Sequence, residues 1–104
     1  MQTIAVITTI DSLERAREIS RRLVERRLAA CAQISTIESV FNWNGDIQSE
    51  TEYRILIKTT DARYADVEKA ILDLHSYELP AIVAVDFSQA YGPYAEWVDE
   101  NSAG

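Results

Sequence analysis

His75 is the only histidine of the chain, and it stands close to Tyr77 and Glu78. An imidazole and a carboxylate are ligands that Cu(II) and Zn(II) accept. Two ligands from one chain are too few for a firm metal site, so an ion here would need another carboxylate or side chains from further copies of the chain. The alternative is structural, because a histidine at the end of a helix interacts favourably with the helix dipole.

Cys31 is the only cysteine, and it is surrounded by the small residues Ala29, Ala30 and Ala32. Its thiolate would be a soft ligand for Cu(I). Free cysteines are more often buried as small apolar side chains, and this is the interpretation that we favour. A single cysteine cannot form an internal disulfide, which argues against a small secreted scaffold.

A second set of candidate residues, Trp43, Glu52, Lys58 and Tyr77, could line a ligand-binding cleft. Aromatic side chains line clefts, but they also anchor interfaces between proteins. Lys58 is expected to be a semi-buried cation that either binds a small anion or pairs with a glutamate. The neighbouring carboxylates can bind a hard cation or form a solvated acidic edge, and both alternatives stay open.

The sequence contains no catalytic signature. Its one histidine and one cysteine are far apart in the chain, and there is no glycine-rich phosphate loop. Residues 8–15 (TTIDSLER) do not supply the arginine-bearing phosphate loop of an acylphosphatase. We therefore expect a binding protein and not an enzyme.

The length and charge of the chain restrict its partners and location. Its 104 residues suffice for one domain, residues 1–104, and 47% apolar with 26% charged residues is typical of a globular protein. A net charge of −7 repels phosphates and anionic lipids, so we expect neither nucleic acid nor a membrane as partner. The first residues lack the basic flank and long apolar run of a signal peptide, which indicates a cytoplasmic location.

The hydrophobic pattern predicts four strands and three helices. A β-branched run over 2–9 predicts a buried strand, and Asp11 with Glu14 predicts a capping box for a helix that extends to Arg27. The expected strands then cover 28–43, 46–60 and 81–87, the last of them buried. Thr60 or Asp61 is expected to cap a second helix, Gly92 begins a third, and residues 101–104 are expected to fray.

The most informative feature is the hairpin around Asn44-Gly45, a dipeptide typical of type I′ turns. A two-residue turn pairs Trp43 with Asp46 and, by counting back, Cys31 with Lys58. Arms of about 15 residues would be about 50 Å long, whereas a compact chain of this size has a radius of gyration of about 13 Å. The tip must either project, which favours a homo-oligomer that covers it, or fold back at a bulge near Ser35.

These elements predict an α+β fold of the ferredoxin-like type, in the order βαββαβ with an added C-terminal helix and a long β-hairpin. At the level of residues, the chain resembles the CutA family of divalent-cation tolerance proteins. The shared segments are VITT at 6–9, LAACAQI at 28–34, FNWNG at 41–45, IKTT at 57–60, HSYELPAI at 75–82 and the residues from Tyr94 to Trp97.

The resemblance implies a homotrimer whose hairpins reach across to neighbouring subunits. It also implies a response to metal ions, with weak binding of copper or another divalent cation that is not required for folding. The metal ligands expected on this basis are His75, Glu78 and Cys31. The alternative is a signalling or scaffolding module of the P-II type that binds a small anion or metabolite in clefts between subunits, an analogy of fold alone.

The chain departs from the family pattern at three positions. Ser76 stands where the family commonly has proline, which loosens the connector after the second helix. Thr8 and Leu74 stand where some members have a cysteine and a second histidine. Any metal site in this chain is therefore poorer in soft ligands than in those relatives.

Overall fold

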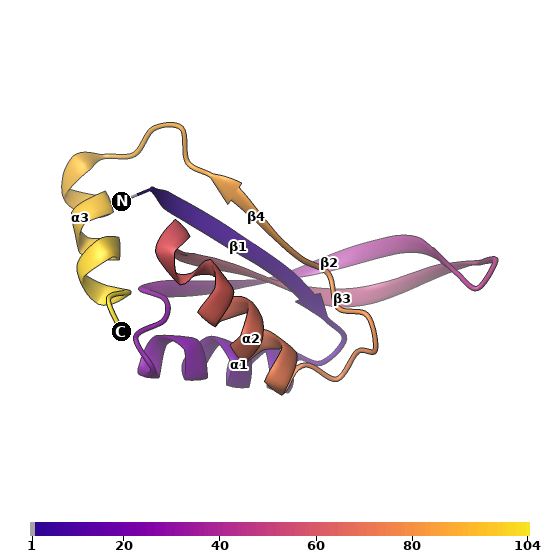
Figure 1. The fold of residues 1–104 in the computed structure, drawn as a ribbon. Coiled ribbons are helices and arrows are strands. Elements are labelled where there is room, and N and C mark those ends of the chain that lie inside the picture. Colours follow the sequence, from indigo (N-terminus) through magenta and orange to yellow (C-terminus); the bar gives the residue numbers. More distant parts are fainter. Residues whose placement is uncertain (1) are drawn as a thin grey trace.

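A four-stranded antiparallel sheet with helices on one face forms the core of the fold (Figure 1). The computed structural model describes residues 2–104. The elements follow in the order β1 (Thr3–Ile10), α1 (Leu13–Glu25), β2 (Cys31–Trp43), β3 (Asp46–Thr60), a 3-10 turn (Asp61–Arg63), α2 (Tyr64–Leu74), β4 (Ile82–Asp86) and α3 (Gly92–Asn101). The strand order is β2-β3-β1-β4, so the predicted α+β plan is confirmed. No helix within residues 2–104 is long and apolar enough to span a membrane.

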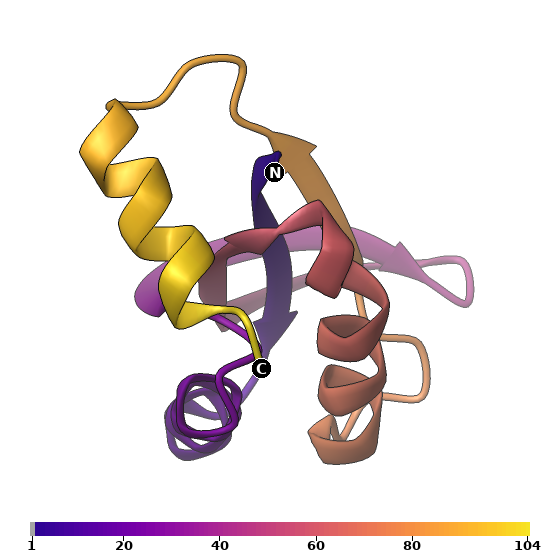
Figure 2. The same ribbon diagram turned by 60° about the vertical axis from the view of Figure 1, so that its left-hand side comes forward.

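Helices α1 and α2 lie side by side against one face of the sheet (Figure 2). Their apolar stripes supply fully buried side chains, among them Ile19 and Leu23 from α1 and Ile71 from α2. These pack on alternate residues of the strands, such as Val6 and Ile55. The core is therefore sandwiched between one sheet face and two amphipathic helices.

The helix starts differ from the sequence prediction. Helix α1 begins at Leu13, and its cap is Ser12, whose side chain accepts a hydrogen bond of 3.2 Å from the Arg15 amide. Asp11 is therefore not the cap, because the strand continues to Ile10 and moves the helix start by one residue. No side-chain hydrogen bond caps α2, which instead follows the 3-10 turn.

The β2–β3 hairpin has the predicted register. Trp43 pairs with Asp46 and Cys31 with Lys58, and the ladder runs without a bulge between them. Asn44 and Gly45 have φ angles of +53° and +86°, the left-handed pair that a type I′ turn requires. The alternative of a bulge that folds the tip back is therefore wrong.

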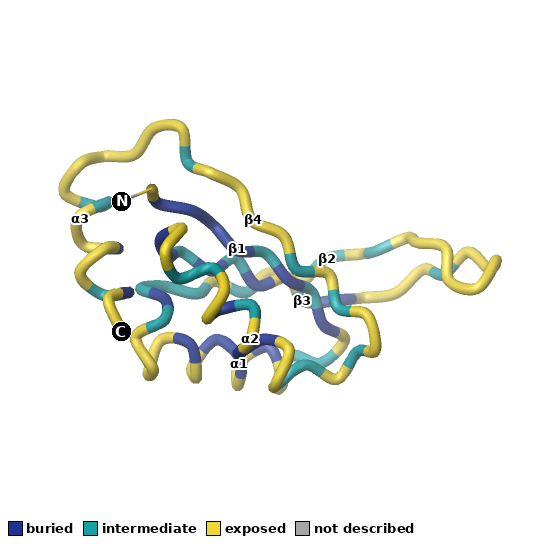
Figure 3. The backbone as a smooth tube through the Cα atoms, viewed as in Figure 1, coloured by how far each residue is buried: buried dark blue, intermediate teal, exposed yellow. Residues whose placement is uncertain are grey.

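The hairpin projects beyond the rest of the subunit (Figure 1). With the hairpin included, the subunit is 45 Å long in its longest dimension. Its outer part is exposed along nearly its whole length (Figure 3). Apolar side chains there are partly or largely open to solvent, including Val40 at 66% and Ile47 at 72%. An isolated subunit thus leaves apolar hairpin surface uncovered.

Strand β4 is not buried as predicted. It is an edge strand that pairs only with β1, and Val83 and Val85 are 55% and 47% exposed. The run is apolar on both faces, but only one face of the sheet is covered by α1 and α2 (Figure 2). The expectation of a buried strand fails within one subunit because the layer that would cover the second face is not part of the same chain.

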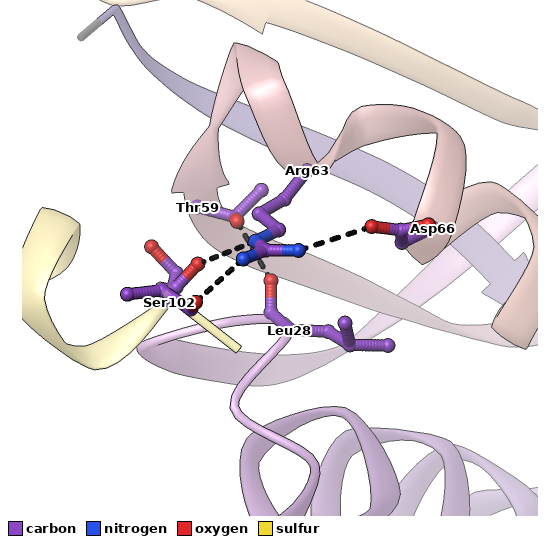
Figure 4. Close-up of polar contacts among 6 residues, drawn as sticks. Leu28, Thr59, Arg63, Asp66 and Ser102 are labelled. Atoms are coloured by element: carbon purple, nitrogen blue, oxygen red, sulfur yellow. Dashed lines mark hydrogen bonds and ion pairs between the residues drawn. The ribbon is translucent and has the colours of Figure 1, made fainter.

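The C-terminal residues 101–104 are held in place, contrary to the prediction that they fray. Arg63 donates hydrogen bonds to the backbone carbonyls of Ser102 and Ala103 and to Asp66 (Figure 4). Arg27 binds the carbonyl oxygens of Glu100 and Gly104 in the same way. Ser102 is consequently 1% exposed, so two arginines distant in sequence anchor the end of the chain.

Candidate functional site

His75 lies at the C-terminal end of α2 and connects this helix to the end of β1 and to the connector that follows α2. Its Nδ1 accepts a hydrogen bond of 3.0 Å from the Tyr77 amide, so in the neutral ring the proton is on Nε2. Nε2 then donates to the backbone carbonyl of Thr9, at 2.8 Å. Both ring nitrogens are engaged, and a metal ion at His75 would have to displace one of these bonds.

Tyr77 continues this connection to the hairpin. Its ring packs edge-on against His75, with 4.7 Å between centroids, and its hydroxyl donates to Oε2 of Glu52 at 2.7 Å. Glu52 is 6% exposed, although it lies in the alternating pattern of a hairpin strand. Burial and the bond to this carboxylate raise the pKa of the Tyr77 phenol well above its ordinary value.

A cavity of about 690 Å³ lies next to this pair, between the hairpin, the end of β1 and the connector after α2. Four of its lining residues are acidic: Asp11, Glu50, Glu52 and Glu78. None of the described residues that line it is basic. The four carboxylates form no ion pair with any residue between 2 and 104, so the cavity is an uncompensated negative environment.

The predicted metal ligands are only partly brought together. Glu78 lines the cavity and His75 is nearby in the connector, but Cys31 is at the other end of the sheet. Cys31 is opposite Lys58 and thus level with Ala5, which is about 13 Å along β1 from Thr9. The Cys31 side chain is half-buried and forms no disulfide.

The set His75, Glu78 and Cys31 therefore does not fit one metal ion within a subunit. Among residues 2–104, no group of three or more His, Cys, Asp or Glu side chains is close enough to hold an ion directly. Direct coordination by a closed protein site needs three or four such ligands.

The predicted cleft residues divide in the same way. Trp43, Glu52 and Tyr77 line the cavity together, but Lys58 is six residues along β3 from Glu52, a separation of about 20 Å. The Lys58 ammonium lies 5.2 Å from the centre of the Tyr94 ring and has no glutamate partner among the described residues. Within one subunit the Lys58–glutamate pair does not form among the described residues, and an anion in this cavity would find no cation among its described lining residues.

Sequence reasoning missed Asp11 as a lining residue, whereas Glu50 is one of the hairpin carboxylates for which the sequence leaves binding of a hard cation open. Asp11 follows directly after β1, whose last residue pairs with Tyr53, next to Glu52 on β3. Glu50 precedes Glu52 by two residues, so both side chains lie on the same face of the strand. The hairpin register was readable from the sequence, but the register of β1 against β3 was not, because no turn connects these strands.

Comparison with known proteins agrees with this architecture. Residues 4–101 match the family model described as CutA1 divalent ion tolerance protein. The chain is 37% identical over 95 residues to the divalent-cation tolerance protein CutA of Archaeoglobus fulgidus, covering 91% of this chain and 93% of the relative. It is 40% identical over 95 residues to a probable divalent-cation tolerance protein cutA homolog of Encephalitozoon cuniculi, covering 91% of this chain and 83% of the relative.

Solved structures of CutA proteins have the same fold as this chain. The structure of the periplasmic divalent cation tolerance protein CutA from Archaeoglobus fulgidus superposes with a TM-score of 0.94 at 35% sequence identity. The superposition covers 96% of this chain and 98% of the other. The likeness therefore extends through the hairpin, the connector and α3.

Proposed function

Since the chain belongs to the CutA1 divalent ion tolerance family, we propose that it supports tolerance to divalent cations by binding them weakly, without chemical turnover. The observation that carries this proposal is the cavity beside the hairpin, which has four acidic lining residues and no basic one among the described residues. Carboxylate oxygens are ligands for hard and borderline divalent cations.

The separation of the carboxylates explains why such binding would be weak. They come from the end of β1, from β3 and from the connector, and no three donors within residues 2–104 converge on one point. A hydrated ion held through its water ligands suits this arrangement better than a directly coordinated one, because bridging waters can span the gaps. Copper or another divalent ion would be exchanged readily, and folding would not depend on it.

Of the three predicted ligands, Glu78 fits this proposal best. It lines the cavity, whereas both ring nitrogens of His75 are hydrogen bonded and Cys31 is distant. The alternative function, binding of a small anion, would use Lys58, which lies about 20 Å along the strand from Glu52. No specific observation favours that alternative in this cavity.

Isothermal titration calorimetry with Cu(II) and Zn(II) tests the proposal on the purified protein and four variants. Glu50→Gln and Glu78→Gln should each weaken binding severalfold, because each removes one negative charge from the cavity. Cys31→Ser should leave binding unchanged, and so should Glu96→Gln, a matched charge change at an exposed residue of α3. Unchanged affinity in both cavity variants, or no binding to the wild type, would contradict the proposal.

A further inference from the structure

Helix α1 and its C-cap carry five exposed arginines, which together we call the arginine face: Arg15, Arg17, Arg21, Arg22 and Arg26. They are half of the ten cations of the chain, whereas residues 14–26 hold only three of its seventeen acidic residues. The remainder of the chain therefore has five cations against fourteen acidic residues. The arginine face is thus a basic surface on an otherwise acidic protein.

The arginine face has no charge partner of its own. The ion pairs found within residues 2–104 are Arg63–Asp66 and Lys69–Asp73, and neither involves α1. Arg15 is moreover in the first turn of α1, where the helix dipole disfavours a positive charge. At this position the arginine is therefore not placed for the stability of the helix.

The exposed side chains of α1 form rows along the helix, because residues three, four and seven apart share one side. Arg17, Arg21 and Val24 make one row, and Val24 is 41% exposed. The other arginines make a second row, and the three glutamates of the helix lie between the two. A partner with evenly spaced negative charges, such as nucleic acid, would meet these glutamates, and it would make no use of Val24.

The arginine face remains accessible when copies of the chain assemble through the sheet. Helix α1 belongs to the helical layer, on the opposite side from the uncovered face of the sheet (Figure 2). A hollow of about 770 Å³ runs along its outer side, and four of the lining residues are arginines, from Arg15 to Arg22. A partner can therefore reach several guanidinium groups at once.

We propose that the arginine face docks an acidic segment of another protein. Carboxylates of the partner pair with the two arginine rows, since a guanidinium group accepts a carboxylate in a bidentate fork. An apolar side chain of the partner covers Val24 at the end of the first row. The acidic remainder of the subunit repels the same partner elsewhere, which orients it toward α1. The inference is independent of the proposed function, because no residue of α1 lines the cavity beside the hairpin.

The test uses calorimetry with a synthetic helical peptide about as long as α1, with leucine and regularly spaced glutamates on one side. A second peptide has glutamine in place of every glutamate. The wild-type protein should bind the glutamate peptide more tightly than the glutamine peptide, and the difference should shrink as salt is added. Arg17→Gln combined with Arg21→Gln should weaken binding about threefold to tenfold, the loss of two exposed ion pairs.

Three further variants show whether the arginines act through binding. Glu18→Gln removes a negative charge between the rows and should strengthen binding, whereas Lys69→Gln, on the neighbouring helix α2, should leave it unchanged. Arg15→Gln should weaken binding without lowering the thermal midpoint, so it replaces the double variant if that one fails to fold. The arginine variants should titrate with Cu(II) and Zn(II) as the wild type does.

Equal affinity for the two peptides, or unchanged affinity in the arginine variants, would overturn the inference. Tighter binding of duplex DNA or of phosphatidylserine vesicles than of the glutamate peptide would overturn it as well, because the partner would then not be a protein. If the metal ions fail to bind but the peptides behave as expected, the proposed function is contradicted and the docking face stands.

Discussion

The Tyr77 hydroxyl donates a hydrogen bond of 2.7 Å to the buried carboxylate of Glu52, and this bond fastens the connector after α2 to the projecting hairpin. His75 supports the same connection from the other side, through the Tyr77 amide and the Thr9 carbonyl. Together these bonds link the helical layer, the central strand β1 and the hairpin. The walls of the cavity are therefore positioned by a structural network in which His75 is a hydrogen-bonding residue.

Replacing Tyr77 by phenylalanine should destabilise the protein and change its response to alkaline pH. The lost bond to a buried carboxylate corresponds to about 1.5–3 kcal/mol in the free energy of unfolding. Burial and the bond to Glu52 raise the pKa of Tyr77 in the folded protein above the ordinary value of 10.0 for a tyrosine. Its contribution is thus fully present below pH 10 and is lost as the pH rises further, because the unfolded state gives up the proton first.

Urea unfolding at pH 7 to 11 measures both effects. Wild-type stability should fall more steeply above pH 10 than that of Tyr77→Phe. Tyr64→Phe is the control, because Tyr64 also has a raised pKa but donates to Glu68 on the same helix, away from the cavity. Equal slopes for wild type and Tyr77→Phe would contradict the role given to this hydrogen bond.

Replacing Ser76 by proline should stabilise the connector. His75 has φ −82° and ψ 143°, an extended conformation that a following proline favours. The Ser76 amide has no hydrogen-bond partner among the described residues, so the substitution removes no bond. Restricting the unfolded chain should raise the free energy of unfolding by about 0.4–1 kcal/mol.

Chemical denaturation of Ser76→Pro and of Ser76→Ala separates the backbone effect from loss of the hydroxyl. Ser76→Ala should be close to neutral because the Ser76 side chain is exposed. A lower midpoint for Ser76→Pro than for Ser76→Ala would mean that the backbone at this position cannot accept proline.

The uncovered face and edge of the sheet lead to a prediction about assembly, for which we propose a homotrimer. Val83 of β4 pairs with Ile7 and is 55% exposed in the subunit. If another copy covers it, Val83→Asp buries an unpaired charge and should shift the protein to a smaller mass in light scattering. Leu72→Asp is the matched control, because Leu72 is similarly exposed, at 52%, but lies on α2, away from the uncovered sheet face. It should leave the mass unchanged. A wild-type mass of 11.8 kDa at micromolar concentration, or an unchanged mass for Val83→Asp, would contradict assembly through this face.

The sequence predicted local relationships better than long-range ones. The register of the hairpin followed from Asn44-Gly45 because a two-residue turn and the two-residue period of a strand leave one pairing. The contact of His75 with Thr9 joins residues 66 positions apart, and nothing local to either residue indicates it. The burial of Glu52 was hidden for the same reason, since the hydroxyl that binds its carboxylate comes from Tyr77, 25 residues away.

The anchored C-terminus gives the last prediction. Arg63 donates three hydrogen bonds, two of them to the carbonyls of Ser102 and Ala103, and the Gly104 amide donates to the Arg27 carbonyl at 3.1 Å. Arg63→Ala should release this segment, so the Gly104 amide should exchange its hydrogen faster, and the free energy of unfolding should fall by about 1–2 kcal/mol.

Lys69→Ala provides the comparison for this variant, because Lys69 forms an exposed ion pair with Asp73 at 3.3 Å. Pairs of this kind contribute about 0.5 kcal/mol or less, so the control should unfold almost like the wild type. Amide exchange followed by NMR separates the two outcomes. Unchanged protection at Gly104 in Arg63→Ala would mean that Arg27 alone holds the end of the chain, and that the guanidinium of Arg63 adds little to the contact drawn in Figure 4.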